Sequence, residues 1–398
     1  MNTCSKCFGE ESLKRRLNEI ASRRVETSCS FHCDEPGVDL ATVRDIFHEA
    51  FSNNYSKGKS GRRDAFRLPE AITNLMQPEN LTFVDVLVQE LINKEKAELF
   101  GPAFYETDAL YENAPTGSIW NSYLWIKFTD SVLHEQRFFN SSARQRLNEI
   151  FRNVEKQRSV RRRSPIYFIE PGKDLSRIKR ARLAEDGLSE KIKGNPYREL
   201  CAPPQRLSMS GRLNPSGIPV FYGAYDVETC VAEIRAPVGS SFYCADFEIS
   251  KPICVLDTTL FEEEQKSLSI FARHQNLRRD QWLFMRQFMQ EISKPVTPNK
   301  EHLDYIPTQI VAEFLKTCFK IRVNQNQTNI DAIIYSSSQK KGGKNIAIFL
   351  PYDPRPNAID SENSDDPSRL RLTLRSYDCY RVQSANFIIA PDFDPYTC

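Results

Sequence analysis

The stretch from Ser210 to Pro237 constrains the fold more than any other part of this chain. A turn-rich segment leads into a short apolar run at 219–224, whose β-branched and aromatic residues predict a buried strand. Asp226 then stands where a helix N-cap is expected, and the apolar spacing of 227–234 predicts a short helix. The stretch therefore predicts a strand followed directly by a helix. We expect the rest of the second half of the chain to pack around this unit.

Three side chains suited to binding or catalysis come from consecutive elements of this stretch: Arg212, Tyr222 and Glu233. Together they suit an anionic, aromatic, sugar-containing ligand, because a guanidinium binds phosphate oxygens bidentately and an aromatic face stacks on a planar ring. The structural alternative is an ion pair between Arg212 and Glu233 that braces the strand and the helix, with Tyr222 in the core. Spacing alone leaves both interpretations open.

Length and composition describe an ordinary soluble protein of two or three domains, at 398 residues with 40% apolar and 27% charged residues. No window approaches 18 uncharged apolar residues and no apolar segment follows Met1, so we expect neither a membrane partner nor a secretory signal. A net charge of +2 gives no reason to expect nucleic acid as a partner. Eleven cysteines, an odd number, predict a reducing, cytoplasmic location.

Two close cysteine pairs near the N-terminus predict a structural zinc site. Cys4 and Cys7 are separated by two residues, and Cys29 and Cys33 by three. Thiolates at such spacings can reach one tetrahedral metal ion, and His32 could replace Cys33 as the fourth ligand. A closed set of four ligands leaves no open position, which argues against a catalytic metal.

The chain is predicted to be an α+β protein with four parts. Residues 1–35 form a small zinc-ribbon-like knuckle, and apolar residues at helical spacing predict an all-α domain over 36–155. The basic, turn-prone segment 156–165 is a linker. Residues 166–398 alternate short strands and helices, and predict a mixed sheet.

In this last part we expect strands at 166–169, 175–183, 332–335, 345–350, 370–374 and 387–390, a strand pair at 242–249 and 252–257, helices at 261–294 and 308–317, and a loop at 353–369.

Several ordered motifs between about residue 165 and the C-terminus resemble the RES domain family, named for Arg, Glu and Ser. They are Arg180-Ala-Arg182, Ala202-Pro-Pro204, Gly211-Arg-Leu-Asn-Pro-x-Gly217, Val220-Phe-Tyr-Gly-Ala224, Thr229-x3-Glu233, Tyr305-x2-Thr-Gln309 with Glu313, and Asp331-Ala-Ile-Ile-Tyr-Ser-Ser337 ahead of Gly342-Gly343. The N-terminal part looks like the HEPN-like domain that precedes RES domains in larger members. Two departures are the Cys29-to-Cys33 spacing and Ala332, where a glycine is common.

The resemblance implies an ADP-ribosyltransferase-like fold and NAD as the substrate. Family members are toxins that cleave the nicotinamide–ribose bond, passing the ribosyl group to phosphate or water, and an Xre-type antitoxin neutralises them. A homodimer is a further expected assembly. The implied catalytic residues are Arg212, Tyr222, Glu233 and Ser337, the last flanked by two other serines. The implied cofactor-binding residues are Arg180, Arg182, Asn214, Tyr335, Ser336 and Gln309.

Two other functions compete with NAD degradation. One is an ADP-ribosyltransferase that modifies a protein or a nucleic acid, which predicts labelled ADP-ribose on a macromolecule. The other is a non-catalytic binding module, which predicts that the protein binds NAD without consuming it.

Overall fold

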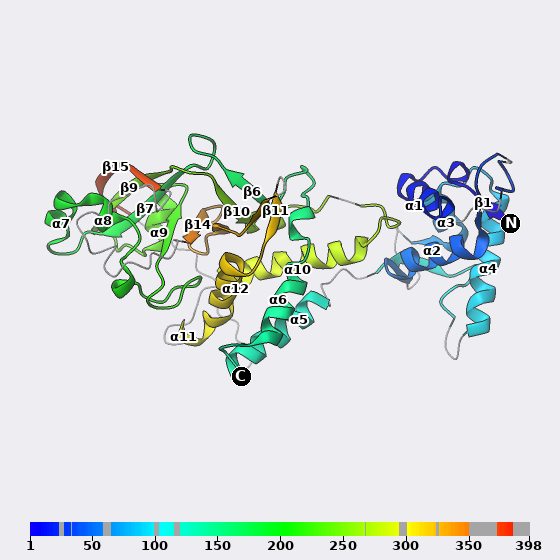
Figure 1. Cartoon of the computed structure of the whole chain (residues 1–398), viewed down its shortest axis with the longest axis horizontal. Helices are drawn as coiled ribbons and strands as arrows, with labels where there is room; N and C mark the ends of the chain where they lie inside the picture. Colours follow the sequence, from blue (N-terminus) through cyan, green and yellow to red (C-terminus); the bar gives the residue numbers. More distant parts are fainter. Residues whose placement is uncertain are drawn as a thin grey trace. The chain divides into compact units, whose positions relative to one another are not determined.

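The computed structural model describes residues 1–23, 28–32, 34–58, 65–98, 103–114, 120–266, 268–293, 301–323, 326–349 and 372–384. The chain divides into two compact units. Unit 1 comprises Met1–Ser118 and Ser267–Asp280, and unit 2 comprises Ile119–Lys266 and Gln281–Cys398. Each unit is described by itself below (Figure 1).

Unit 1 is mostly helical and holds two small antiparallel sheets. Its helices are η1 (Ser5–Cys7), α1 (Glu11–Ala21), α2 (Leu40–Ser52), α3 (Leu68–Met76) and α4 (Thr82–Glu98). Strand β1 (Asn2–Thr3) pairs with β2 (Val38–Asp39), while β5 (Leu110–Asn113) lies between β3 (Tyr55–Lys57) and β4 (Phe66–Arg67). The expectation of an all-α domain is therefore wrong for 36–155. Strands of two to four residues are too short to show a period-2 pattern in the sequence.

Unit 2 is built on one mixed sheet of eight strands, in the order β15-β9-β7-β8-β14-β13-β10-β6. Only β10 and β13 pair in parallel; the other neighbours are antiparallel. The strands are β6 (Ile166–Ile169), β7 (Arg177–Leu183), β8 (Val220–Ala224), β9 (Ser241–Ile249), β10 (Ile253–Asp257), β13 (Ala332–Ser336), β14 (Lys344–Phe349) and β15 (Leu372–Arg381). The mixed sheet expected from the sequence is confirmed.

Helices bury both faces of this sheet. One face packs against α5 (Trp120–Asp130), α6 (Ser141–Ile150), α12 (Ile306–Thr317) and the Trp282–Ile292 part of α10 (Gln275–Ser293). The opposite face packs against α7 (Leu188–Gly194) and α8 (Pro196–Leu200), which lie at the other end of the unit in Figure 1. The helices at 120–130 and 141–150 thus contribute to the core of unit 2, with Phe128 and Ile150 fully buried.

The strand-to-helix unit expected around Asp226 is confirmed. Strand β8 leads into α9 (Val227–Glu233), and the Asp226 carboxylate caps the helix by accepting a hydrogen bond of 2.8 Å from the Thr229 backbone N–H. Gly223 lies where β8 meets β7, and a Cβ there would stand 2.5 Å from Ile178 Cγ2 and 2.9 Å from the Lys179 carbonyl oxygen. Only glycine permits this close approach of the two strands.

Two expectations for the second half are wrong. The strands at 241–249 and 253–257 do not pair with each other, because β9 pairs with β7 and β15 while β10 pairs with β13 and β6. The helix expected over 261–294 begins only at Gln275, after the short helix η5 (Thr258–Glu262). The loop at 353–369 and the strand at 387–390 lie outside the described residues.

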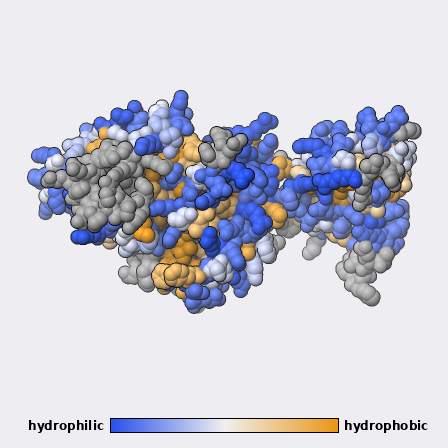
Figure 2. Space-filling view, in the orientation of Figure 1, coloured by the Kyte–Doolittle hydropathy of each residue, from blue (hydrophilic) through white to orange (hydrophobic). Residues whose placement is uncertain are grey.

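The visible surface is mainly hydrophilic, with scattered hydrophobic patches (Figure 2). Within the described ranges, no helix is both long enough and apolar enough to cross a membrane.

Candidate functional site

Three neighbouring strands of unit 2 bring candidate side chains to one face of the sheet. Strand β14 lies between β8 and β13, with Tyr335 opposite Asn345 and Tyr222 opposite Ala347. Side chains alternate between the two faces along a strand. Tyr222, Tyr335 and Ala347 belong to the same cluster of packed side chains, so the three positions share a face. Asn345 is two residues from Ala347 on β14, which places it on that face too.

Glu233 joins this face from the end of α9. Its Oε1 accepts a hydrogen bond of 2.6 Å from Ser337 Oγ, just after β13, and one of 2.7 Å from Asn345 Nδ2 at the start of β14. The structure therefore brings Glu233 and Ser337 into direct contact, although they are 104 residues apart. No other hydrogen bond joins Glu233 to the described side chains, so Oε2 is open to a ligand.

The turn between β13 and β14 is fastened to the start of α9. A Cβ on Gly343 would stand 2.5 Å from Thr229 Oγ1, so the turn approaches the helix as closely as glycine allows. Lys340 Nζ lies 2.7 Å from Asp226 Oδ1 and 3.6 Å from Glu228 Oε2. These contacts hold the turn that carries Ser337 against the helix that carries Glu233.

We expect the Lys340–Asp226 contact to stabilise the fold in full above about pH 4 and progressively less below it. Burial raises the pKa of Asp226, but bonds from Lys340 and Thr229 outweigh it and lower the pKa to about 2, from an ordinary 3.8. Because the pKa is lower in the folded state, the contribution is complete above 3.8 and is lost as the pH falls through about 2. Lys340→Ala should therefore lower the melting temperature near neutral pH, and the difference from wild type should close as the pH falls towards about 2.

Melting curves across this pH range test the expectation. Lys341→Ala is the matched control, because this exposed neighbour forms no ion pair among the described residues. A wild-type advantage that persisted at the lowest pH would show that Lys340 acts through something other than the Asp226 carboxylate.

Arg212 presents a guanidinium with no carboxylate partner among the described residues. Its Cζ lies 5.5 Å from the centre of the Tyr305 ring, and the side chain is half-buried. No ion pair joins Arg212 to Glu233, which removes the bracing role considered as the structural alternative. A half-buried guanidinium that rests on an aromatic ring without a counter-ion is suited to an anionic ligand.

The loop that carries Arg212 is held from two sides. From the start of α12, Thr308 Oγ1 donates to the Arg212 carbonyl oxygen (2.5 Å), and Gln309 Nε2 donates to the carbonyl oxygens of Gly211 (2.8 Å) and Asn214 (3.0 Å). From β8, Tyr222 Oη donates to Asn214 Oδ1 (2.8 Å). Gln309 and Asn214, expected at the cofactor, therefore use their amides to shape the loop.

Tyr335 interacts electrostatically with both Arg212 and Glu233. Only 8% of the residue is exposed, and its hydroxyl has no hydrogen-bond partner among the described residues. Burial raises the pKa of Tyr335 well above its usual value, Tyr222 and Glu233 add to the rise, and Arg212 opposes it. Tyr335 thus stays a neutral hydroxyl, and its electrostatic neighbours include both Arg212 and Glu233.

The other residues expected at the cofactor already have protein partners. Arg180 Nη1 donates to the Tyr222 carbonyl oxygen (2.5 Å), and its guanidinium lies 5.5 Å from the Phe221 ring. Arg182 forms an ion pair with Glu199 (3.1 Å), and Ser336 Oγ donates to Glu262 Oε1 (2.8 Å). These side chains support the strands around the site.

Two residues of the site, Tyr305 and Asn345, were not predicted from the sequence. Tyr305 opens the motif that ends at Gln309, but nothing in the sequence relates its ring to Arg212. Asn345 begins a predicted strand, between Lys344 and the apolar run at 346–350, and its sequence neighbours give no sign of its role. A buried amide needs a hydrogen-bond partner, and Asn345 is only 3% exposed.

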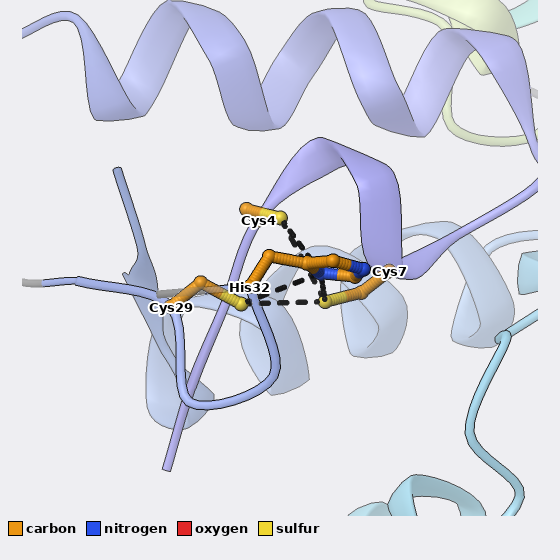
Figure 3. Close-up of side chains that lie close together, drawn as sticks. All are labelled: Cys4, Cys7, Cys29 and His32. Carbon is orange, nitrogen blue, oxygen red and sulfur yellow. Dashed lines mark hydrogen bonds between the residues drawn. The ribbon is translucent and has the colours of Figure 1, made fainter. Parts of the chain in front are cut away.

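Unit 1 contains a separate group of four side chains that could hold a metal ion: Cys4, Cys7, Cys29 and His32. Figure 3 shows them converging from the segment around η1 and the loop at 28–32. Cys7 Sγ lies 3.8 Å from Cys4 Sγ and 3.5 Å from Cys29 Sγ, and His32 Nδ1 lies 3.4–3.8 Å from all three sulfurs. Cys33, the other expected ligand, lies outside the described residues.

The surroundings of these ligands match those of a metal site. All three cysteines are buried, and the Phe31 backbone N–H donates to Cys29 Sγ (3.4 Å). His32 turns Nδ1 to the sulfurs, while its Nε2 lies 3.4 Å from Glu79 Oε2. A carboxylate behind a ligating histidine is the usual means of fixing its ring orientation.

Part of the chain matches a known family model. Residues 177–373 match the model of the RES domain, which supports the resemblance seen in the motifs and covers every expected catalytic residue. The match does not include the Met1–Ser118 segment of unit 1. No curated protein and no solved structure matches the chain.

Proposed function

We propose that the RES domain at residues 177–373 makes this chain an NAD-degrading enzyme that cleaves the bond between nicotinamide and ribose. RES domains are associated with NAD-related toxin activity. The observation that carries the proposal is the pairing pattern of the site. Among the described residues, no partner occupies Oε2 of Glu233 and no carboxylate pairs with Arg212, yet both side chains are electrostatic neighbours of Tyr335. Separate anionic and cationic groups suit a ligand with a pyrophosphate and a cationic ring.

In this proposal Arg212 binds the pyrophosphate of NAD through its guanidinium fork. Its packing against Tyr305 limits the conformations of the side chain before the ligand arrives. Tyr222, half-buried on the same face of the sheet as Tyr335, offers its ring to the nicotinamide. The bound substrate thus spans the face between the 210–214 loop and the end of α9.

The reaction breaks the bond between ribose C1′ and the nicotinamide nitrogen. The bonding electron pair leaves with nicotinamide, which departs as a neutral base, and positive charge develops on the ribose. The open Oε2 of Glu233 stabilises that charge electrostatically, as carboxylates do in glycoside-cleaving enzymes. Water or phosphate then forms the new bond to C1′ and releases a proton to solvent. Ser337 acts through its hydrogen bond to Glu233.

The remaining functional expectations complete this proposal: an ADP-ribosyltransferase-like fold, a toxin or defence role in the cytoplasm, an Xre-type antitoxin as partner, and a homodimer.

Time courses of NAD loss with and without phosphate, with product analysis, test the reaction and identify the acceptor. Label on protein or nucleic acid would favour ADP-ribosyl transfer instead. NAD binding without consumption would favour the non-catalytic module.

Arg212→Ala should raise the KM for NAD about 10- to 100-fold, because the pyrophosphate loses a charge-assisted, bidentate contact. Arg212→Lys should recover only part of the loss, since an ammonium keeps the charge without the fork. Steady-state kinetics measure both, with Arg206→Ala as the control, because Arg206 is an exposed arginine in the nearby short helix η4 (Gln205–Leu207). Equal KM values for wild type and Arg212→Ala would exclude this role.

We also propose that the four ligands in unit 1 bind a structural zinc ion. A tetrahedral site with Zn–S bonds of about 2.3 Å and a Zn–N bond of about 2.0 Å separates its ligand atoms by roughly 3.5–3.8 Å. The distances from Cys7 Sγ and His32 Nδ1 to the neighbouring ligand atoms are 3.4–3.8 Å, so the residues fit the ion. Three sulfurs and one nitrogen are also a donor set that zinc prefers.

A further inference from the structure

The carboxylate of Glu233 receives two hydrogen bonds on the same oxygen, from two different strand ends. Ser337 Oγ donates from the end of β13 (2.6 Å), and Asn345 Nδ2 donates from the start of β14 (2.7 Å). Both bonds end on Oε1. Oε1 of Glu233 therefore accepts two hydrogen bonds from the protein, whereas Oε2 accepts none from the described residues. The properties of the two donors explain this difference.

The Ser337 hydroxyl has one proton, and its surroundings decide where that proton points. Ser337 Oγ accepts hydrogen bonds from the backbone N–H groups of Gln339 (3.1 Å) and Lys340 (3.1 Å). A hydroxyl has two acceptor lone pairs and one donor proton, so both lone pairs are occupied. The proton is therefore donated to Glu233, and the oxygen is poorly suited to act as a nucleophile.

Asn345 provides the second donor from a rigid position. The residue is 3% exposed, and it is paired with Tyr335 in the ladder between β13 and β14. Its Nδ2 group can only donate, so Oε1 of Glu233 must be an acceptor. Side chains held by packing and by strand pairing keep a functional group in place without rearrangement during reaction.

We infer that Asn345 is a positioning residue, which together with Ser337 fixes Oε1 of Glu233 and turns Oε2 to the ribose of the ligand. This inference rests on the proposed function for the identity of the ligand. The hydrogen-bond arrangement itself does not depend on it. Asn345 acts through Glu233 and makes no contact of its own with the reacting atoms.

The first test exchanges donor and acceptor between the two residues. Asn345→Asp places a second carboxylate against Glu233, which should lower the melting temperature by about 2 to 8 °C. Adding Glu233→Gln supplies an amide donor to that new carboxylate and should restore most of the loss. Glu228→Gln, on the same helix but exposed, should restore none. The inference would be overturned if Asn345→Asp lowered the melting temperature equally in the wild-type protein and in the Glu233→Gln variant.

The second test separates positioning from ligand binding. Asn345→Ala should lower kcat for NAD loss about 10- to 100-fold while changing KM by less than about threefold, because Arg212 still binds the pyrophosphate. An unchanged kcat, or a rise in KM alone, would contradict the positioning role. If the wild-type protein does not consume NAD, the proposed function fails, whereas the melting cycle still decides whether Asn345 holds Glu233.

Discussion

Glu233→Gln should reduce NAD cleavage by about 10³-fold or more while leaving the protein folded. Glutamine is nearly the same size as glutamate, and its amide oxygen can still accept the hydrogen bonds from Ser337 and Asn345. The substitution therefore removes the negative charge and keeps most of the geometry. Since the proposed step develops positive charge on the ribose, the loss should fall on kcat rather than on KM.

The matched control is Glu190→Gln, which removes a charge from an exposed position in the first turn of α7. Its NAD consumption should equal that of the wild type. Melting curves and circular dichroism of both variants establish that α9 is intact. Full NAD cleavage by folded Glu233→Gln would refute the assignment of this carboxylate, and with it the proposed mechanism.

Metal analysis of the purified chain should find about one zinc ion per molecule, and its removal should unfold the region around η1 and the 28–32 loop. The three buried cysteines come from both segments, so a bound ion would join the segments directly. Cys7→Ser and Cys29→Ser should lose the metal. Glu79→Gln should keep the four ligands but weaken zinc binding by about 10- to 100-fold, because the His32 ring loses its carboxylate.

Cys33→Ser is the informative companion to these variants. If Cys4, Cys7, Cys29 and His32 complete the site, Cys33→Ser retains zinc and His32→Ala loses it. Hydrogen exchange of the backbone in α1 reports the loss of structure in unit 1, while exchange in β8 and β14 reports unit 2 separately. Zinc lost from Cys33→Ser and kept by His32→Ala would reverse the assignment of the fourth ligand.

Local patterns predicted the elements that local forces create. The apolar run at 219–224 became β8, and Asp226 capped the following helix, because strand burial and N-cap hydrogen bonds involve residues close in sequence. Spacing along the chain did not predict which strands pair, because tertiary packing determines the pairing. Strands β9 and β10 are neighbours in sequence, yet they pair with other partners.

The sequence by itself determined which chemical groups are available: the four cysteines at metal-ligand spacing, and the Arg212, Glu233 and Ser337 set of the RES motifs. Only the tertiary structure decided how these groups are used. It places His32 beside the sulfurs, commits the Arg180 and Gln309 side chains to backbone contacts, and brings Asn345 to Glu233 across 112 residues. The physical reason is that hydrogen-bond partners are set by distance in space, which neither periodicity nor spacing along the chain encodes.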